Sequence, residues 1–153
     1  MYMQKIMPGD HPYCRCLFYS ANALARATTR IAEEAFGATG LAPSVAYVLM
    51  SVLREPGVSP GRLAGIMMLD ASTVTRLLER LERKRLVRRQ ARGRAVAVFP
   101  TPAGEALRST LAGCAKQVME RFGRVLGRRT TGLTADVFEA AVAMGGETTR
   151  RKP

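Results

Sequence analysis

Apolar residues recur at intervals of three and four through most of the chain, the spacing of amphipathic helices. The first such stretch begins at Tyr13 and ends near Gly37, a residue that favours a helix C-terminus. A second begins at Pro43, which suits the first turn of a helix, and continues to Leu53. The segment EPGVSPG, residues 55–61, then interrupts the pattern. Two helices are therefore predicted before this break.

A short helix, a tight turn and an amphipathic helix are predicted next. The sequence GRLAGIMM forms the short helix, and Leu69 and Asp70 form the turn, with Asp70 as a good N-cap. The helix that follows carries its apolar residues on one face, at Val74, Leu77, Leu78 and Leu81. Its opposite face is polar. This order of elements is a helix-turn-helix.

The hydrophobic period changes after the helix-turn-helix. VRRQ and RAVAVFP are predicted to be two short strands joined by ARG, with Gly93 at the tip of a hairpin. A hairpin placed directly after a helix-turn-helix is a wing.

Helices return after the wing. Thr101 and Pro102 have the cap and first-turn chemistry to begin a long helix, and Gly127 and Gly132 bracket a break before the last one. The predicted apolar stripe of the long helix is Leu107, Leu111, Ala115, Val118, Phe122 and Val125. The expected fold is mainly α with a small β-wing (α+β), in one domain over residues 1–153.

Charge is distributed unevenly along the chain. Residues 1–70 carry six basic and five acidic side chains, whereas residues 71–153 carry eighteen and seven, so that +11 of the net +12 falls in the second part. Nine Lys and Arg side chains lie between Arg76 and Arg94 alone. Such a bias indicates a polyanionic partner, either nucleic acid or an anionic membrane surface.

Double-stranded DNA fits the predicted elements best. An α-helix enters the major groove with its N-terminal residues at the base edges, and basic wing residues reach phosphates or the minor groove. The predicted DNA-binding residues are Ser72, Thr73, Thr75, Arg76, Arg80, Arg89, Arg92 and Arg94. The alternative is a solvated basic helix with local ion pairs such as Glu79–Arg83 and Glu82–Arg85.

The sequence GRLAGIMMLDASTVTRLLERLERKRLVRR, followed by GRAVAVFPTPAGEAL, resembles the MarR family of bacterial transcription regulators. The resemblance is strongest over residues 61–107 and includes Thr101, Ala103 and Gly104 after the wing. The wing itself is shorter than is common in the family, and QARGRA replaces its usual acidic-plus-arginine pattern.

The resemblance implies a homodimer and a mode of action. Residues 13–42 and 102–146 would form the dimerisation helices, around a DNA-binding lobe of residues 43–101. The family binds pseudo-palindromic operators, usually as a repressor, and is released by small phenolic or other effectors or by oxidants. A two-fold dimer would place two recognition helices ~34 Å apart, about one DNA turn.

Three cysteines are candidates for redox sensing. Cys14 and Cys16 open the predicted first helix, where thiolates are favoured, and Cys114 lies in the long helix. The arrangement is similar to the organic-hydroperoxide-sensing branch of the family, which implies oxidation of Cys14 or Cys16 and resolution by Cys114 of the partner subunit. Alternatively, Cys114 is a core residue and the other two are incidental. His11 with Cys14 and Cys16 lacks a fourth metal ligand, so no metal is predicted.

A ligand pocket is the competing switch. The family's pockets lie between the dimerisation helices and the lobe, and methionine and tyrosine suit an adaptable site for a small aromatic ligand. Candidate lining residues are Tyr19, Tyr47, Met50, Met67 and Met68, although residues of these types more often belong to a core.

Other classes of function fit less well. The chain has one His and no catalytic triad, paired carboxylates or phosphate-binding loop, so neither an enzyme nor a cofactor is expected. No apolar run approaches the ~20 residues of a membrane span, and no signal peptide is recognisable, which predicts a cytoplasmic protein. A non-specific nucleoid-type DNA-binding protein stays an alternative.

Overall fold

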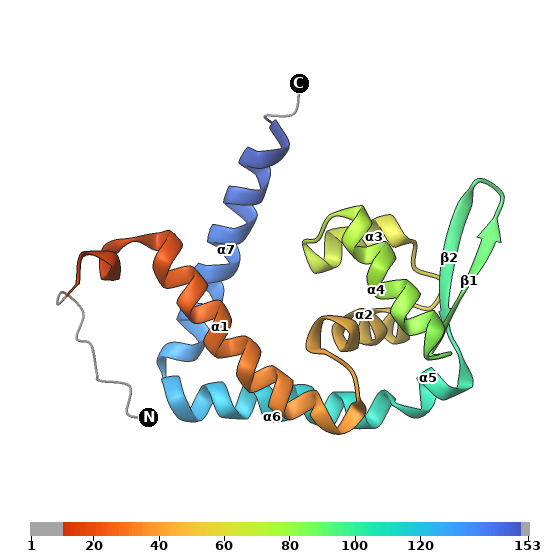
Figure 1. Ribbon diagram of the computed structural model, residues 1–153, viewed down its shortest axis with the longest axis horizontal. Helices are drawn as coiled ribbons and strands as arrows, with labels where there is room; N and C mark the ends of the chain where they lie inside the picture. The colour runs from red at the N-terminus through yellow and green to blue at the C-terminus, as the bar shows by residue number, and fades with distance from the viewer. Residues whose placement is uncertain (1–10, 151–153) are drawn as a thin grey trace.

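The computed structural model describes the backbone of residues 11–150 and the side chains of residues 11–145. Helices and one two-stranded antiparallel sheet make up this part of the chain (Figure 1). The elements in chain order are the 3-10 helix η1 (Pro12–Arg15), α1 (Leu17–Phe36), the 3-10 helix η2 (Gly37–Thr39), α2 (Pro43–Arg54), α3 (Pro60–Met67), α4 (Ala71–Arg83), β1 (Val87–Arg92), β2 (Ala95–Pro100), α5 (Pro102–Ala106), α6 (Arg108–Leu126) and α7 (Arg129–Arg150). The predicted class, mainly α with a small β-wing, is confirmed.

The elements fall into two groups joined by α6. Figure 1 shows α2, α3, α4 and the hairpin packed into a lobe, with α1 and α7 on the other side of the molecule. Helix α6 extends beneath both groups. Arg108 of α6 donates to the Leu53 carbonyl of α2 at 3.0 Å, and Arg121 of α6 pairs with Glu34 of α1 at 2.7 Å. These contacts fix the lobe relative to α1.

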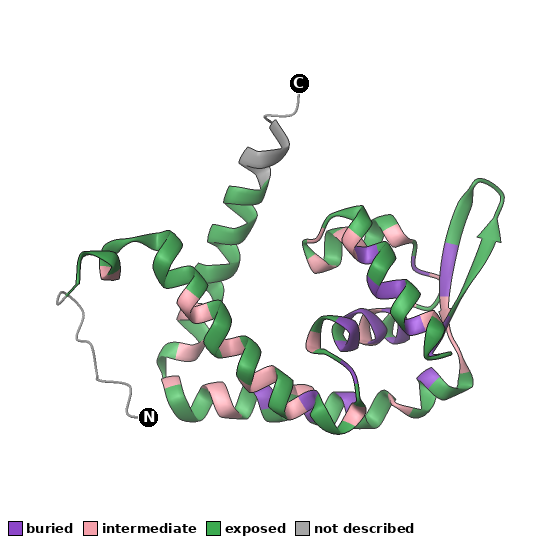
Figure 2. Cartoon of the chain, viewed as in Figure 1, coloured by how far each residue is buried: buried purple, intermediate pink, exposed green. Residues whose placement is uncertain are grey.

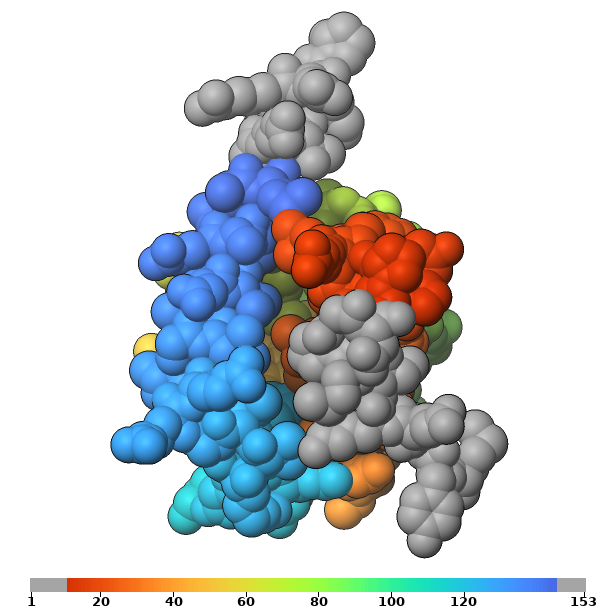
Figure 3. Space-filling model, turned by 90° about the vertical axis from the view of Figure 1, so that its left-hand side faces the viewer, coloured from red at the N-terminus to blue at the C-terminus, as the bar shows by residue number. Residues whose placement is uncertain are grey.

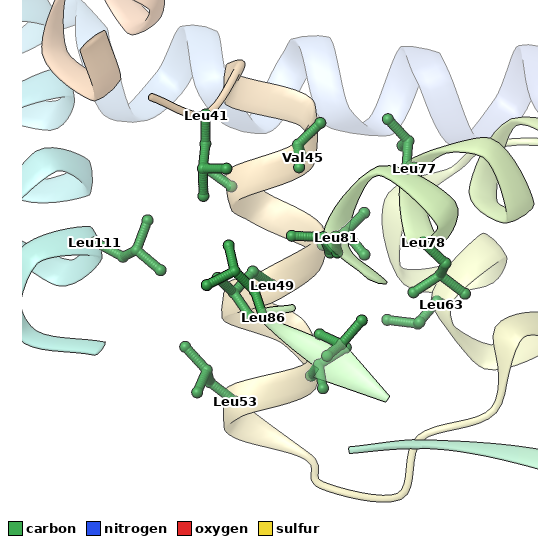
Figure 4. Packing of buried hydrophobic residues seen from close by; sticks show 14 of the residues in the cluster. Leu41, Val45, Leu49, Leu53, Leu63, Leu77, Leu78, Leu81, Leu86 and Leu111 are labelled. Atoms are coloured by element: carbon green, nitrogen blue, oxygen red, sulfur yellow. The ribbon is translucent and has the colours of Figure 1, made fainter. Parts of the chain in front are cut away.

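The hydrophobic core lies in the lobe, around α2. Buried residues concentrate there, whereas most of α1 and α7 is exposed (Figure 2). Figure 4 shows Leu63, Leu78 and Leu81 on one side of α2 and Leu111 of α6 on the other. Each fully buried side chain of this size contributes ~1.5–3 kcal/mol. The predicted inward face of α4, Val74, Leu77, Leu78 and Leu81, is buried and confirmed.

The helix-turn-helix is closed by local hydrogen bonds. Ser59 caps α3 by accepting the Arg62 N–H at 3.1 Å. The turn to α4 passes through Met68, whose φ of +53° is the left-handed conformation in which helices commonly end. Asp70 caps α4 by accepting the Thr73 N–H at 2.7 Å. The predicted cap is therefore confirmed.

The wing is anchored to the segment before α3. Strands β1 and β2 pair antiparallel, with Arg92 opposite Ala95 at the tip, and Gly93 has a φ of +60° in the turn, as predicted. An isolated bridge pairs Val58 with Val98. This bridge ties the base of the hairpin to the helix-turn-helix.

The first helix starts later than predicted. Tyr13 and Cys14 lie in η1, where the His11 ring nitrogen accepts the Tyr13 N–H at 3.4 Å. Cys16 has an extended backbone and occupies the N-cap position of α1. Pro12 and this cap favour one short 3-10 turn before the helix begins at Leu17.

Two predictions about the later helices are also wrong. The long helix is divided at Leu107, whose amide donates to the Gly104 carbonyl at 3.1 Å and tightens the turn between α5 and α6. Gly132 lies inside α7, because one glycine costs a helix only ~1 kcal/mol relative to alanine. Val125, in the predicted apolar stripe, is 73% exposed, since this end of α6 extends beyond the lobe.

Candidate DNA-binding surface

The hydroxyl groups predicted to meet DNA surround the cap of α4. The Asp70 carboxylate accepts from the Ser72 hydroxyl at 2.5 Å, from the Thr73 N–H at 2.7 Å and from the Thr73 hydroxyl at 2.8 Å. These bonds hold the pKa of Asp70 far below its ordinary value, and the bond from Ser72 has the largest effect. The Thr75 hydroxyl donates to the Ala71 carbonyl at 3.0 Å. The first turn of α4 is thus rigidly hydrogen-bonded at the surface.

Basic side chains follow along the exposed face of α4. Arg76 donates weakly to the Ser72 carbonyl, with 3.4 Å between the atoms. Arg80, Arg83 and Lys84 have no ion-pair or hydrogen-bond partner for their side chains among the described residues. Arg80, Arg83 and Lys84 line a hollow of about 330 Å³ between the end of α4 and the start of α2. Their mutual repulsion is unrelieved within the described chain.

Phe99 organises two arginines on the wing. The guanidinium carbons of Arg88 and Arg92 lie 4.9 and 5.2 Å from its ring centroid. Arg94, beside Gly93 in the turn, is exposed. The role of Phe99 was missed from the sequence, although alternation along a strand places Arg88 and Arg92 on one face. The strand register, which places Arg88 opposite Phe99, brings the ring beside these two arginines.

Arg89 differs from its neighbours because it faces α4. It donates to the Glu82 carboxylate at 2.9 and 2.5 Å, which raises the pKa of Arg89 and lowers the pKa of Glu82. The expected Glu82–Arg85 pair is replaced, since Arg85 has left the helix with a φ of +56°. The charge of Arg89 is therefore offset within the protein, whereas Arg88 and Arg92 have no acidic partner among the described residues.

The candidate pocket residues are dispersed. Tyr19 lies near the start of α1, with its ring centroid 5.6 Å from that of Tyr13. Tyr47 of α2 packs on Phe36 at the same centroid distance, 5.6 Å. Met68 is exposed in the turn of the helix-turn-helix. Met50 and Met67 are half-buried against the core of the lobe.

The cysteines differ in accessibility. All three are free, with Cys14 half-buried in η1, Cys16 exposed at the start of α1 and Cys114 buried in α6. Cys114 belongs to the core cluster of the lobe and α6. The described residues contain no group of three or more potential metal ligands, so His11, Cys14 and Cys16 do not form one.

Within the described residues no single helix is long and apolar enough to cross a membrane. The stretch Leu17–Thr39 together with Pro43–Arg54 meets the criteria of length and composition only as a pair bent by 65°.

A helix-turn-helix followed directly by a β-hairpin, with basic side chains on both, defines a winged helix-turn-helix protein. Residues 39–95 match the model of the MarR family. This match confirms, over residues 39–95, the family resemblance seen in the sequence. Nearness to the organic-hydroperoxide-sensing branch stays a prediction. No curated protein sequence matches the chain.

Solved structures of transcriptional regulators share the fold well beyond the matched segment. The regulator SlyA superposes with a TM-score of 0.76 at 18% identity, over 90% of this chain and 99% of its own. MepR of S. aureus, in complex with DNA, superposes with a TM-score of 0.73 at 16% identity, over 84% of this chain and 97% of its own. CouR of Rhodococcus jostii RHA1, bound to p-coumaroyl-CoA, superposes with a TM-score of 0.69 at 20% identity, over 82% of this chain and 91% of its own. The likeness therefore includes α1 and α6 as well as the lobe.

Proposed function

We propose that the protein is a homodimeric transcription regulator that binds a specific pseudo-palindromic site in double-stranded DNA and acts there as a repressor. The observation that carries the proposal is the row of exposed cations on and just after α4, none of which forms an ion pair among the described residues, continued by Arg88, Arg92 and Arg94 on the wing. A duplex supplies phosphates that offset their repulsion, and the polar first turn of α4 meets the bases.

The dimer is inferred from apolar surface on the other side of the molecule. Phe18 is 79% exposed on α1 and Phe138 is 61% exposed on α7. Figure 3 views this face, where the start of α1 lies beside α7. A groove of about 340 Å³ between α1, α6 and α7 is lined mostly by apolar side chains, including Leu24, Phe122 and Phe138. A second copy of the chain would cover this surface and present a second α4 to the same duplex.

Release from DNA is proposed to follow either ligand binding or cysteine oxidation. CouR, which shares this fold, is bound to p-coumaroyl-CoA, and this supports a small-molecule effector. The exposed Cys16 and the half-buried Cys14 support oxidation by a hydroperoxide. Resolution by Cys114 of the partner subunit would require this buried thiol to become accessible. Regulation of chromosomal genes would require the protein to act in the cytoplasm.

Fluorescence anisotropy with duplex DNA from upstream of the protein's own gene tests the proposal. A scrambled duplex of the same length is the control, and each titration is run in reductant, after an organic hydroperoxide, and after reductant is restored. We expect the upstream duplex to bind at least ~10³-fold more tightly than the scrambled one. We also expect log affinity to fall with log salt by ~0.9 per phosphate contacted.

Each outcome distinguishes the parts of the proposal. Reversible loss of binding on oxidation would identify the cysteines as the switch, and Cys14→Ser and Cys16→Ser would show which one. Binding that survives oxidation would leave a small-molecule effector as the switch. Equal affinity for upstream, scrambled and genomic fragments would contradict a specific regulator and favour the nucleoid-type alternative.

A further inference from the structure

The hydroxyl groups in the first turn of α4 have their protons committed within the protein. A hydroxyl has one proton to donate and two lone pairs that accept. The partners of Ser72, Thr73 and Thr75 are the Asp70 carboxylate and the Ala71 carbonyl, at 2.5, 2.8 and 3.0 Å. Neither an ionised carboxylate nor a carbonyl carries a proton, so in each pair the hydroxyl is the donor. The positions of the oxygen atoms therefore fix the directions of these bonds.

The same bonds determine what the hydroxyls can still contact. Their remaining lone pairs accept hydrogen bonds but cannot donate one. Phosphate oxygens only accept, so a phosphate contact would first have to break a bond to Asp70 or to the helix. In the major groove, adenine N6 and cytosine N4 donate, whereas guanine O6 and thymine O4 accept. An acceptor-only surface is matched by amino groups and repelled by keto groups.

We propose that Asp70 sets the base preference of this protein, by making Ser72 and Thr73 acceptors that select adenine or cytosine over guanine or thymine on the strand they contact. This inference rests on the proposed function, because it requires α4 to enter the major groove. Asp70 acts as a positioning residue and need not touch the DNA. Arg76, four residues after Ser72 on α4, is a donor and complements the hydroxyls with affinity for guanine.

Asp70→Asn tests this assignment because it inverts one bond while retaining a good N-cap. The Asn carbonyl oxygen can keep the Thr73 N–H and the Ser72 hydroxyl. Its amide group replaces the second carboxylate oxygen and donates to the Thr73 hydroxyl, whose proton is then free to donate to a base. Apart from the lost negative charge, only the hydrogen-bonding polarity of Thr73 changes.

The measurement is selection of bound sequences from a randomised duplex library, followed by affinity measurements on the best site with single base changes. The wild-type protein is expected to prefer adenine or cytosine by about tenfold at a position in each half-site. Asp70→Asn should bring this preference close to parity at that position and leave the others unchanged. Asp136→Asn, on the exposed surface of α7, removes the same charge far from α4 and should select the wild-type site.

The outcomes separate the inference from the function on which it rests. Absence of any enriched site for the wild-type protein would overturn both. An enriched site whose preferences are the same in Asp70→Asn, or wild-type selection of guanine and thymine at the hydroxyl-contacted positions, would overturn the role of Asp70 alone. A uniform loss of affinity across all sequences would also count against it, since that is the result of a cap with a purely structural role.

Discussion

Gly104 lies in the first turn of α5, against the backbone of the residue that leads into the wing. A Cβ atom added there would lie 2.1 Å from the Leu86 carbonyl oxygen. The approach is close because Thr101, the N-cap of α5, is hydrogen-bonded to the segment just before β1. Its N–H donates to the Leu86 carbonyl at 3.0 Å, and its hydroxyl donates to the Arg85 carbonyl at 2.6 Å. The glycine therefore allows α5 to pack directly against the backbone at the start of the wing.

Gly104→Ala is expected to lower the free energy of unfolding by ~1–3 kcal/mol, because the Leu86 backbone must move to admit a methyl group. Gly113→Ala is the matched control, since nothing lies within 4 Å of the Cβ position of Gly113 on the exposed face of α6. It should have the opposite sign, stabilising by ~0.5–1 kcal/mol. Urea unfolding followed by circular dichroism measures both, and equal stability of Gly104→Ala and wild type would refute the close contact.

Single residues show where sequence reasoning succeeds. The caps at Asp70 and Thr101 could be predicted because they depend on local chemistry. The closeness of Gly104 to Leu86 could not, since it depends on the tertiary path of the wing. The same holds for the partner of Arg89, a residue that the sequence predicted to bind DNA. Only the packing of β1 beside α4 brings Glu82 within reach of it.

At the scale of elements, the end of α4 decides how the wing begins. The Arg85 amide donates to the Glu82 carbonyl at 2.8 Å and the Leu86 amide to the Leu81 carbonyl at 2.9 Å. This pair of bonds requires a left-handed residue, which here is Arg85 with a φ of +56°. The sequence has no glycine at this point, so periodicity predicted the end of the helix but not its geometry.

Arg85→Gly should therefore stabilise the protein. A non-glycine residue in the left-handed conformation destabilises the fold by ~1–2 kcal/mol. Glycine removes this strain, but its greater entropy in the unfolded chain lowers the free energy of unfolding by ~0.4–1 kcal/mol. We expect a net gain of ~0.5–1 kcal/mol in the free energy of unfolding. Arg80→Gly removes the same charge from inside α4 and should instead cost ~1 kcal/mol. Chemical denaturation of both variants at one salt concentration makes the comparison, and losses of similar size would rule out a left-handed Arg85.

At the scale of the whole molecule, the two groups of helices differ in how fully they are packed. The lobe buries a continuous core, whereas α1 and α7 leave large apolar side chains exposed. The hydrophobic pattern predicted helices in both groups equally well, because it reports which face of a helix is apolar. It cannot say whether the same chain or a second one covers that face. Val125, which belongs to the predicted apolar stripe and is exposed in this chain, illustrates this ambiguity.

Phe138→Glu tests whether a second chain covers α7. Phe138 is 61% exposed and lines the apolar groove between α1, α6 and α7, so a carboxylate there would have to be buried unpaired in the dimer while remaining solvated in the monomer. We expect sedimentation velocity to show a monomer with the helical content of the wild type. Its affinity for the operator should fall by ~10²-fold or more, because the second lobe no longer binds at high effective concentration. Gln117→Glu places the same charge on an exposed position of α6 and should remain dimeric. A Phe138→Glu protein that sediments as a dimer would place the partner on another face, and the exposed residues of α7 would then need a different explanation.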